Sequence, residues 1–430
     1  MLKTSYKSYM LGLLTTVAAF NYLDRILLTL LLEPIKSEFN LNDTQLGFLT
    51  GFSFTLFYAF AGIPIARWAD RGNRTFIITV TTGMWSTMVV LCGLVGNFVQ
   101  LLLVRIGVAV GEAGCLPPAQ SFIAEYFDRE KRPRAMAIYW ACYPIAVIFG
   151  YLVGGWLAEN LGWRLTFIVM GVPGIFLAVV VKLTLVEPRL QKPNTMIEVG
   201  HPSFKDVLTA LWGQQSFRHI MMAFCVAYFF AMGIIQWIPT FFIRYHQMEL
   251  GELGIWLALS WGVFGLLGTY IGGVFVTRFA IGNEQLQMRI VALVICLYGL
   301  LFLFVYLTSH KYTALIMLAV IAMLSNSLNG PIFSAIQSLV NDRMRSTAIA
   351  LIFLFANLIG FGIGPLAVGA LSDLLRPVFG MESLRYALII FSPGLIWPAY
   401  YYWKAGTTIN LDVLKIESEL HDAPRVVKDV

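Results

Sequence analysis

Charged residues are scarce in this sequence. Only 13% of the 430 residues are Asp, Glu, Lys or Arg, whereas 58% are hydrophobic; a soluble protein averages about 25% charged residues. This composition excludes an ordinary soluble domain and indicates a membrane protein long enough for about twelve spans. The net charge of +6 does not indicate nucleic-acid binding, because the charges stand in short clusters between apolar runs.

Cysteine and histidine are also few, and neither forms a pattern typical of a reactive or metal-binding site. The five cysteines fall within apolar runs without disulfide or zinc spacing and are predicted to be buried, inert thiols: Cys92, Cys115, Cys142, Cys225 and Cys296. The five histidines lie in loops, at span ends or in the tail, and no phosphate-binding Gly-x-x-x-x-Gly-Lys-Ser/Thr loop is present. We therefore expect no enzymatic activity, no cofactor, no metal and no ATP drive.

Long apolar runs make up most of the sequence. They occur at about 8–32, 44–66, 75–96, 98–127, 134–158, 163–186, 217–245, 253–278, 287–308, 311–339, 346–372 and 384–403. They predict an all-α membrane protein with twelve transmembrane helices, since the alternation of barrel strands is absent. The first run contains Asp24 and Arg25 and is too long for a signal peptide, so it is predicted to remain as a span.

Basic residues are concentrated on one side of the predicted spans. With the N-terminus placed inside, only six of the 30 lysines and arginines fall in outer segments, and Arg25 and Arg105 fall within the membrane. The outer six are Lys36, Arg164, Arg244, Lys311, Arg376 and Arg385. The positive-inside rule therefore predicts that both termini are cytoplasmic. A multi-pass protein of the cytoplasmic (inner) membrane is expected if the source is bacterial.

The longest polar interruption divides the spans six and six. It predicts an N-terminal six-helix bundle (1–186), a cytoplasmic linker (187–216) with a short amphipathic helix at 203–211, a C-terminal six-helix bundle (217–405) and a weakly ordered cytoplasmic tail (406–430). The sequence contains an internal repeat: residues 132–138 resemble residues 343–349, and residues 155–159 resemble residues 369–373. Two parallel, pseudo-symmetric halves place a binding site between them near the membrane midplane.

Four charged residues lie deep inside the predicted spans, away from the span ends. A charge at that depth costs roughly 3 kcal/mol on insertion scales, so pairing, water or function must offset it. Asp24 and Arg105 lie at similar depth on spans one and four, which predicts an ion pair between them. Glu112 shares a face with Arg105 and lies ~10 Å deeper, with no basic partner evident from the sequence. Arg25 points about 100° away from Asp24, toward either an anion or a neighbouring helix.

These residues suggest a mechanism. Burial of an unpaired carboxylate favours its protonated form, so we expect Glu112 and Asp24 to carry protons as a cavity wets and dries. Arg105 would switch between Asp24 and an anionic head group. The alternative is a static buried salt-bridge network, which adds little stability.

The loop after span two carries a recognisable motif. Asp70-Arg71-Gly72-Asn73-Arg74 resembles the signature loop of the major facilitator superfamily, although Ala66 replaces the usual leading glycine. The resemblance implies a conformational latch formed by Asp70, Arg71, Arg74 and Glu125, in which Asp70 caps a helix of the opposite half and Arg71 pairs with Glu125. It also implies two six-helix bundles that work by alternating access.

Three further motifs resemble the spinster-type branch of this superfamily: residues 20–25, residues 111–113 and residues 124–127. That branch is linked to export of lysophospholipids and sphingosine-1-phosphate with proton coupling. The resemblance implies a proton-coupled transporter of an amphipathic, lipid-like anion, with protons and membrane lipids as its other partners and a monomer as its state.

The second half offers amides and aromatics instead of deep charges. The candidates for substrate contact there are Tyr228, Gln236, Trp237, Asn329 and Asn357, beside Arg25 and Arg105 in the first half. A cavity charged on one side and apolar on the other suits an amphipathic anion. A small organic anion or drug-like molecule remains an alternative cargo, and a non-transporting membrane receptor is a further alternative.

Overall fold

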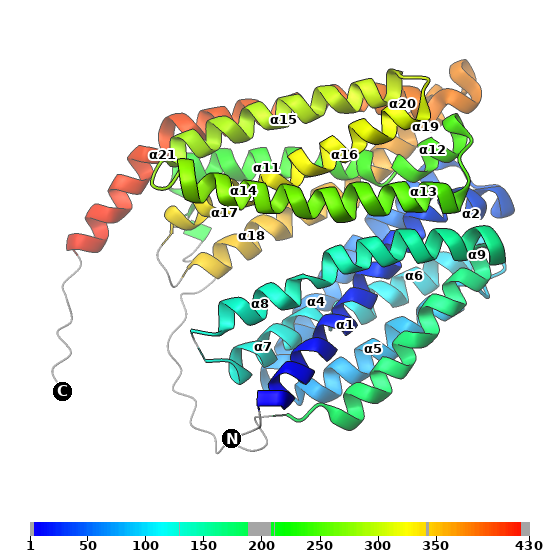
Figure 1. Ribbon diagram of the computed structural model, residues 1–430, viewed down its shortest axis with the longest axis horizontal. Coiled ribbons are helices and arrows are strands. Elements are labelled where there is room, and N and C mark those ends of the chain that lie inside the picture. The colour runs from blue at the N-terminus through cyan, green and yellow to red at the C-terminus, as the bar shows by residue number, and fades with distance from the viewer. Residues whose placement is uncertain (1–3, 129, 188–207, 210, 341–343, 423–430) are drawn as a thin grey trace.

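The computed structural model describes residues 4–128, 130–187, 208–209, 211–340 and 344–422. Within these ranges the regular structure is helical throughout, without a strand. Two bundles of helices converge at one end and diverge toward the other, where both termini lie (Figure 1). We name these the distal end and the terminal end. The predicted all-α fold of two six-helix bundles is confirmed.

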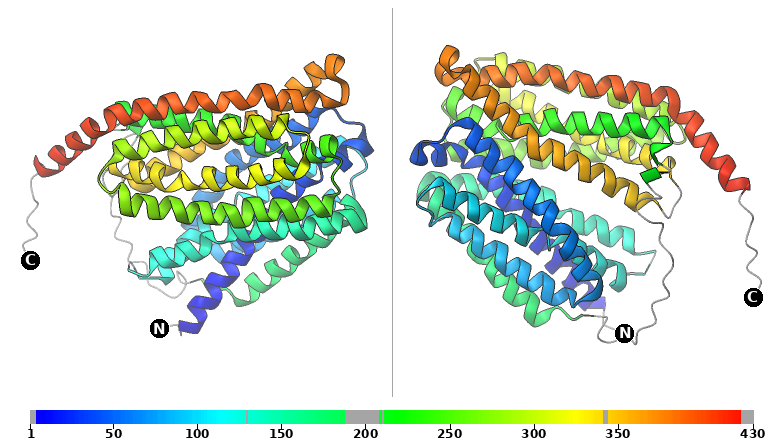
Figure 2. Two further views of the ribbon diagram at one scale, coloured as in Figure 1. Left: turned by 45° about the horizontal axis from the view of Figure 1, so that its top comes forward. Right: turned by 180° about the vertical axis from the view of Figure 1, so that it is seen from behind.

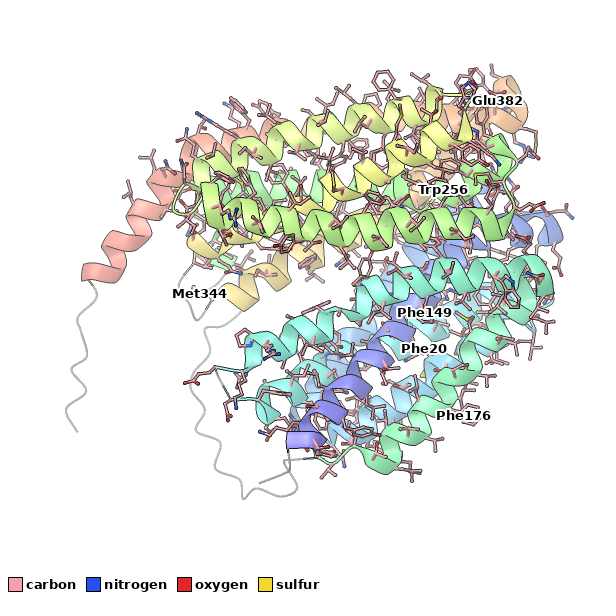
Figure 3. The ribbon with its side chains drawn as sticks, viewed as in Figure 1. Phe20, Phe149, Phe176, Trp256, Met344 and Glu382 are labelled. Carbon is pink, nitrogen blue, oxygen red and sulfur yellow. The ribbon has the colours of Figure 1, made fainter. Side chains whose placement is uncertain are left out.

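The first bundle holds the first six predicted spans. Its elements are α1 (Thr4–Leu30), α2 (Leu32–Phe39), α3 (Asp43–Gly47), η1 (Phe48–Phe52), α4 (Ser53–Arg71), α5 (Arg74–Cys92), α6 (Phe98–Glu112), α7 (Leu116–Tyr126), α8 (Arg132–Trp140) and α9 (Cys142–Thr184). α9 contains two spans, and the chain reverses between them at Gly162, whose φ of 76° is accessible to glycine. Phe149 and Phe176 project from the two halves of this helix (Figure 3).

The second bundle repeats this plan. Its elements are α11 (Gln215–Ile235), α12 (Ile238–His246), α13 (Leu250–Leu257), η3 (Ala258–Phe264), α14 (Gly265–Phe279), α15 (Glu284–Leu307), α16 (Lys311–Ser327), α17 (Asn329–Ser338), α18 (Arg345–Asn357), η4 (Leu358–Ile363), α19 (Gly364–Phe379), η5 (Gly380–Glu382), α20 (Ser383–Phe391), η6 (Ser392–Ile396) and α21 (Trp397–Asp422). Within the described ranges, ten helical stretches are long and apolar enough to cross a membrane, and two of them, Arg132–Thr184 and Leu351–Lys415, contain 53 and 65 residues. Each of those two holds two predicted spans, so every predicted run coincides with helix.

The C-terminal region differs from its prediction. The weakly ordered tail was expected from residue 406, yet α21 continues as one helix to Asp422. Its continuation packs against the bundle: Ile409 is fully buried, and Asp412 accepts a hydrogen bond from the backbone N–H of Ser216 at 2.8 Å. Six of the nine residues of the predicted linker helix at 203–211 fall outside the described residues; the other three, Leu208, Thr209 and Leu211, are helical.

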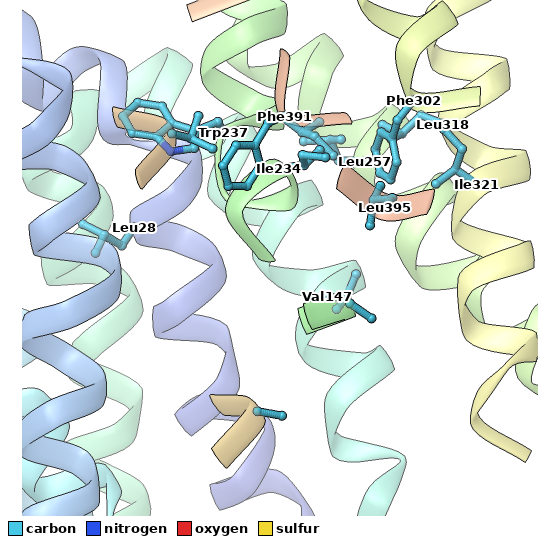
Figure 4. Close-up of a cluster of buried hydrophobic side chains, with 14 of the residues drawn as sticks. Leu28, Val147, Ile234, Trp237, Leu257, Phe302, Leu318, Ile321, Phe391 and Leu395 are labelled. Atoms are coloured by element: carbon cyan, nitrogen blue, oxygen red, sulfur yellow. The ribbon is translucent and has the colours of Figure 1, made fainter. Parts of the chain in front are cut away.

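Buried apolar side chains join the bundles. The largest cluster includes Leu28 and Val147 from the first bundle together with Ile234 and Leu257 from the second (Figure 4). Span two runs beside α19 along the back of the molecule (Figure 2, right), and α13 runs beside the first half of α9 (Figure 1). Among side chains that the structure describes, every hydrogen bond between the bundles lies at the distal end.

Candidate functional site

An ion pair joins α1 to α6 inside the first bundle. Arg105 Nη1 lies 2.5 Å from Asp24 Oδ2, and each side chain is 2% exposed. This is the pair that matching depth on two antiparallel spans predicted, and it is confirmed. Its two charges neutralise each other in a place where either one alone would be costly.

A second ion pair lies beside it and corrects the sequence prediction for Glu112. Arg25 Nε lies 2.7 Å from Glu112 Oε2, so Glu112 does have a basic partner. Arg25 therefore points to a neighbouring helix in this conformation. The exposures of the two side chains differ sharply, because Arg25 is 27% exposed while Glu112 is fully buried. Arg25 is thus the most accessible member of the four charges, and Arg105 is sealed.

Aromatic rings of α4 cover both guanidinium groups. The Phe54 ring centroid lies 4.6 Å from Cζ of Arg25 and 5.4 Å from Cζ of Arg105. Tyr58 lies 4.8 Å from Arg25. The negative faces of these rings stabilise the cations by roughly 0.5–2 kcal/mol each. Phe54 is 6% exposed, so it also screens Arg105 from the outside.

Several buried polar atoms around the two pairs lack hydrogen-bond partners among the described residues. They are Asp24 Oδ1, Arg105 Nε, Glu112 Oε1 and Asn21 Nδ2. An unsatisfied buried group costs about 1–3 kcal/mol, and charged groups cost more. A static network would be expected to satisfy these atoms. Their clustering on α1 and α6 indicates a site that has other arrangements or takes up water or protons.

The charged cluster near the terminal end is organised by Arg74. Its Nη2 lies 2.5 Å from Glu125 Oε2, its Nη1 donates to Ser121 at 2.8 Å, and its backbone N–H donates to Glu187 Oε2 at 2.7 Å. Arg74 Nη2 also pairs with Glu187. Arg74 is fully buried, and this clamp ties α5 and α7 to the end of α9.

Two consequences follow for the predicted latch. Glu125 was expected to pair with Arg71, and the described partner is Arg74; the side chains of Asp70 and Arg71 fall outside the described residues. Sequence reasoning missed Glu187. Its signal was an acidic residue at the start of the linker, directly after span six.

The candidates of the second bundle lie on several elements. Trp237 is 1% exposed and its indole N–H donates to the carbonyl of Pro365 at 3.0 Å, so in this conformation it is buried within the second bundle, and its contact with substrate stays a prediction. Tyr228 stacks on Phe224 at a centroid distance of 4.7 Å within an aromatic cluster of α11 and α18.

The three amide candidates are more accessible than Trp237. Gln236 and Asn357 are half-buried and Asn329 is exposed. They lie on separate elements: Gln236 directly follows α11, Asn329 begins α17 and Asn357 ends α18. The structure therefore brings the four charges of the first bundle together, and a shared role of the three amides in substrate contact stays a prediction.

Comparison with known proteins gives a consistent picture. Residues 14–403 match the Major Facilitator Superfamily. The chain is 33% identical over 408 residues to an MFS-type efflux pump of Mycolicibacterium smegmatis, covering 94% of each chain. It is 27% identical over 398 residues to protein spinster homolog 1 of Xenopus laevis, covering 86% of this chain and 75% of the relative.

A solved structure is also similar along nearly the whole chain. It is the crystal structure of a bacterial homologue of the human lysosomal transporter Spinster, in an inward-facing and unoccupied conformation. The TM-score is 0.84 with 28% sequence identity, and the match covers 95% of this chain and 99% of the other.

Proposed function

Because the chain belongs to the Major Facilitator Superfamily, in its spinster-type branch, we propose that it is a proton-coupled secondary transporter of an amphipathic, lipid-like anion. The cargo would be of the lysophospholipid or sphingoid phosphate class. It would cross by alternating access of the two bundles around the charged cluster of α1 and α6.

One observation carries this proposal: a partly exposed guanidinium is held by a fully buried carboxylate. Arg25 is 27% exposed and Glu112 is 0% exposed across a 2.7 Å pair. An anionic head group that reaches the cluster would therefore meet Arg25 first. This revises the expected role of Arg105, which stays with Asp24 behind Phe54.

The pair also supplies a coupling mechanism. When an anion binds Arg25, Glu112 loses part of its counter-charge in a fully buried position. A proton taken up by Glu112 restores neutrality, so anion and proton favour each other's binding. Asp24 can likewise take up a proton if its ion pair with Arg105 breaks. Protons and the anion would then share one cluster and one conformational change.

We propose that the distal end is extracytoplasmic and that the protein is inward-facing in this conformation. The six outer basic residues of the positive-inside count lie on distal elements. The distal end holds the inter-bundle hydrogen bonds of the described side chains, which is the arrangement expected when the cytoplasmic side is open. Resemblance to an inward-facing structure supports this assignment. A monomer of the inner membrane is the simplest state.

Similarity to an efflux pump favours a second cargo, a small drug-like molecule. A thermal-shift screen with lysolipids, sphingoid phosphates, small organic acids and drug-like cations, repeated across pH, separates the two. The lipid-anion proposal expects stabilisation by lysolipids or sphingoid phosphates that grows when the medium is acidified. Stabilisation by drug-like cations alone would replace it with the second cargo.

The coupling step is tested in proteoliposomes. Glu112→Gln should abolish proton-driven uptake of the stabilising lipid, because the amide keeps a polar contact but cannot exchange a proton. Glu38→Gln is the control: Glu38 is an exposed distal carboxylate of α2, its pKa is lowered by its hydrogen bonds with Arg164, and it is not a member of the charged cluster. Undiminished proton-driven uptake by Glu112→Gln would remove Glu112 from the mechanism.

A further inference from the structure

The distal end is closed by two carboxylates that each cap a helix of the opposite bundle. Asp373 of α19 caps α3, and Glu159 of α9 caps α13. The two residues occupy matching positions in the internal repeat, at the ends of segments 155–159 and 369–373. The same pseudo-symmetry therefore relates two seams, α3/α19 and α9/α13. A carboxylate at a helix N-terminus satisfies free N–H groups and interacts favourably with the helix dipole.

The α3/α19 seam is held by a dense polar network. Asp373 accepts hydrogen bonds from the backbone N–H groups of Asp43 and Thr44, at 3.0 and 2.7 Å, and from the Thr44 hydroxyl at 2.6 Å. The carboxylate of Asp43 is bound by two residues of the second bundle. Arg244 donates hydrogen bonds to both of its oxygens, at 2.9 and 2.8 Å, and the Ser372 hydroxyl donates a third at 2.6 Å.

Burial strengthens this network. Asp43 is 1% exposed, so water cannot readily replace its partners. Arg244 extends the contact to α2, where it pairs with Glu33 at 2.6 Å. Backbones also touch along the seam, since a Cβ on Gly47 would lie 2.5 Å from the carbonyl oxygen of Pro365.

The α9/α13 seam is held much more simply. Glu159 accepts one hydrogen bond, from the backbone N–H of Gly251 at 2.6 Å, and Glu159 is exposed. It lies in a surface groove of about 550 Å³ together with Trp156, which is 60% exposed. Below this contact the helices meet through glycine, and a Cβ on Gly155 would lie 2.6 Å from the carbonyl oxygen of Leu250. Dispersion and one accessible hydrogen bond therefore close this side.

From this asymmetry we propose that the distal end opens first along the α9/α13 seam, while the α3/α19 seam acts as the hinge side. Glu159 is the release point, since water entering the groove can replace its single bond to Gly251. The network of Asp43, Arg244 and Asp373, in which Asp43 is buried, keeps the other seam together until the bundles have already begun to part. The proposal needs only that the bundles change their relative position, as in alternating access, and is independent of cargo and of protons.

Distance measurements between spin labels test this order. One pair, at Asn160→Cys and Glu249→Cys, reports on the α9/α13 seam, and a second, at Ser37→Cys and Arg376→Cys, reports on the α3/α19 seam; all four positions are exposed. The native cysteines are replaced by alanine. Each pair is measured in the otherwise unaltered chain, with Glu159→Gln, and with Glu382→Gln as the charge-matched control. Glu382 is a distal carboxylate whose partner, Arg385, belongs to its own bundle.

Glu159→Gln should lengthen and broaden the distances of the first pair and leave the second pair unchanged. Glu382→Gln should change neither. Equal opening of both seams, or opening of the α3/α19 seam first, overturns the proposal. Undiminished proton-driven uptake by Glu112→Gln would count against the proposed coupling and not against this order of opening, which the label distances alone decide.

Hydrogen exchange on the unaltered chain provides a test that no variant can obscure. Amides in the first turn of α13 (Leu250–Leu257) should exchange roughly tenfold faster, or more, than those in the first turn of α3 (Asp43–Gly47), because their cap is solvent-accessible. Equal or slower exchange at α13 would contradict the proposal.

Discussion

At the scale of single residues, the charged cluster shows how far depth along a helix predicts contact. Asp24 and Arg105 meet because their distances from the distal ends of α1 and α6 match. Arg25 and Glu112 do not match in this way, and they meet because the guanidinium lies at the end of a long, flexible side chain. Depth follows from the 1.5 Å rise per residue, whereas the partner of a long side chain depends on how the helices are rotated against each other.

A double-mutant cycle tests whether the sealed pair is coupled. Arg105→Gln leaves Asp24 buried without its counter-charge and should lower the unfolding free energy by about 3–5 kcal/mol. Asp24→Asn/Arg105→Gln removes both charges and should recover a large part of that loss. Thermal unfolding in detergent gives the comparison. A loss in the double variant equal to the sum of the losses in Asp24→Asn and Arg105→Gln would show that the two side chains do not depend on each other.

Arg25 should respond differently to a conservative change. Lysine keeps the charge but loses the planar contact with Phe54 and Tyr58, which lie 4.6 and 4.8 Å from the guanidinium carbon. We expect Arg25→Lys to weaken binding of the lipid anion about tenfold, with Arg105→Lys weaker in its effect because Arg105 is sealed behind Phe54. Binding titrations measure both. A larger loss in Arg105→Lys would return the head-group contact to Arg105.

At the scale of elements, a buried arginine connects helices of the first bundle at their terminal ends. Arg74 connects α5, α7 and the end of α9 through Ser121, Glu125 and Glu187. The motif loop therefore has a structural task inside the first bundle in this conformation. The predicted latch, in which Asp70 caps a helix of the opposite bundle and Arg71 pairs with Glu125, stays a prediction.

The clamp makes a stability prediction. Glu187 is 2% exposed and Glu125 is 23% exposed, so Glu187→Gln should destabilise the protein more, by about 1–3 kcal/mol. Glu130→Gln serves as the control, because Glu130 is exposed in the neighbouring loop. Thermal unfolding of the three variants decides the order. A larger loss of stability in Glu125→Gln would contradict this and show that the contact between Arg74 and α7 contributes more to stability than the contact with Glu187.

Glycine contacts let the α9/α13 helices approach closely, and one substitution tests this. A Cβ on Gly254 would overlap the carbonyl oxygen of Tyr151, whereas a Cβ on Gly273 would meet no atom within 4 Å. Gly254→Ala should therefore push the seam apart and shift the protein toward distal-open states, while Gly273→Ala should not. The Asn160/Glu249 label pair reports the shift, and unchanged distances in Gly254→Ala would show that the seam tolerates the extra methyl group.

At the scale of the whole molecule, the sequence was enough to predict the helical class, the twelve runs and the two halves. Hydrophobic length and the polar break between spans six and seven determine these features locally. The Arg25–Glu112 pair, the packing of Trp237 and the continuation of α21 were not predictable, because each depends on which helix faces which. The matched ends of segments 155–159 and 369–373 were visible as a repeat, but their capping role appears only when opposite bundles are brought together.

The orientation of the molecule in the membrane decides whether the closed distal end makes this conformation inward-facing or outward-facing. If the distal end is extracytoplasmic, a membrane-impermeant maleimide should label Asn160→Cys in intact cells, because this residue is exposed at the distal corner of α9. Leu414→Cys, on the exposed face of α21 near the terminal end, should react only after the cells are permeabilised. Both are measured in the background without native cysteines. The reverse pattern would place the closed end in the cytoplasm. The same structure would then be outward-facing, and an anion would reach Arg25 from the extracytoplasmic side.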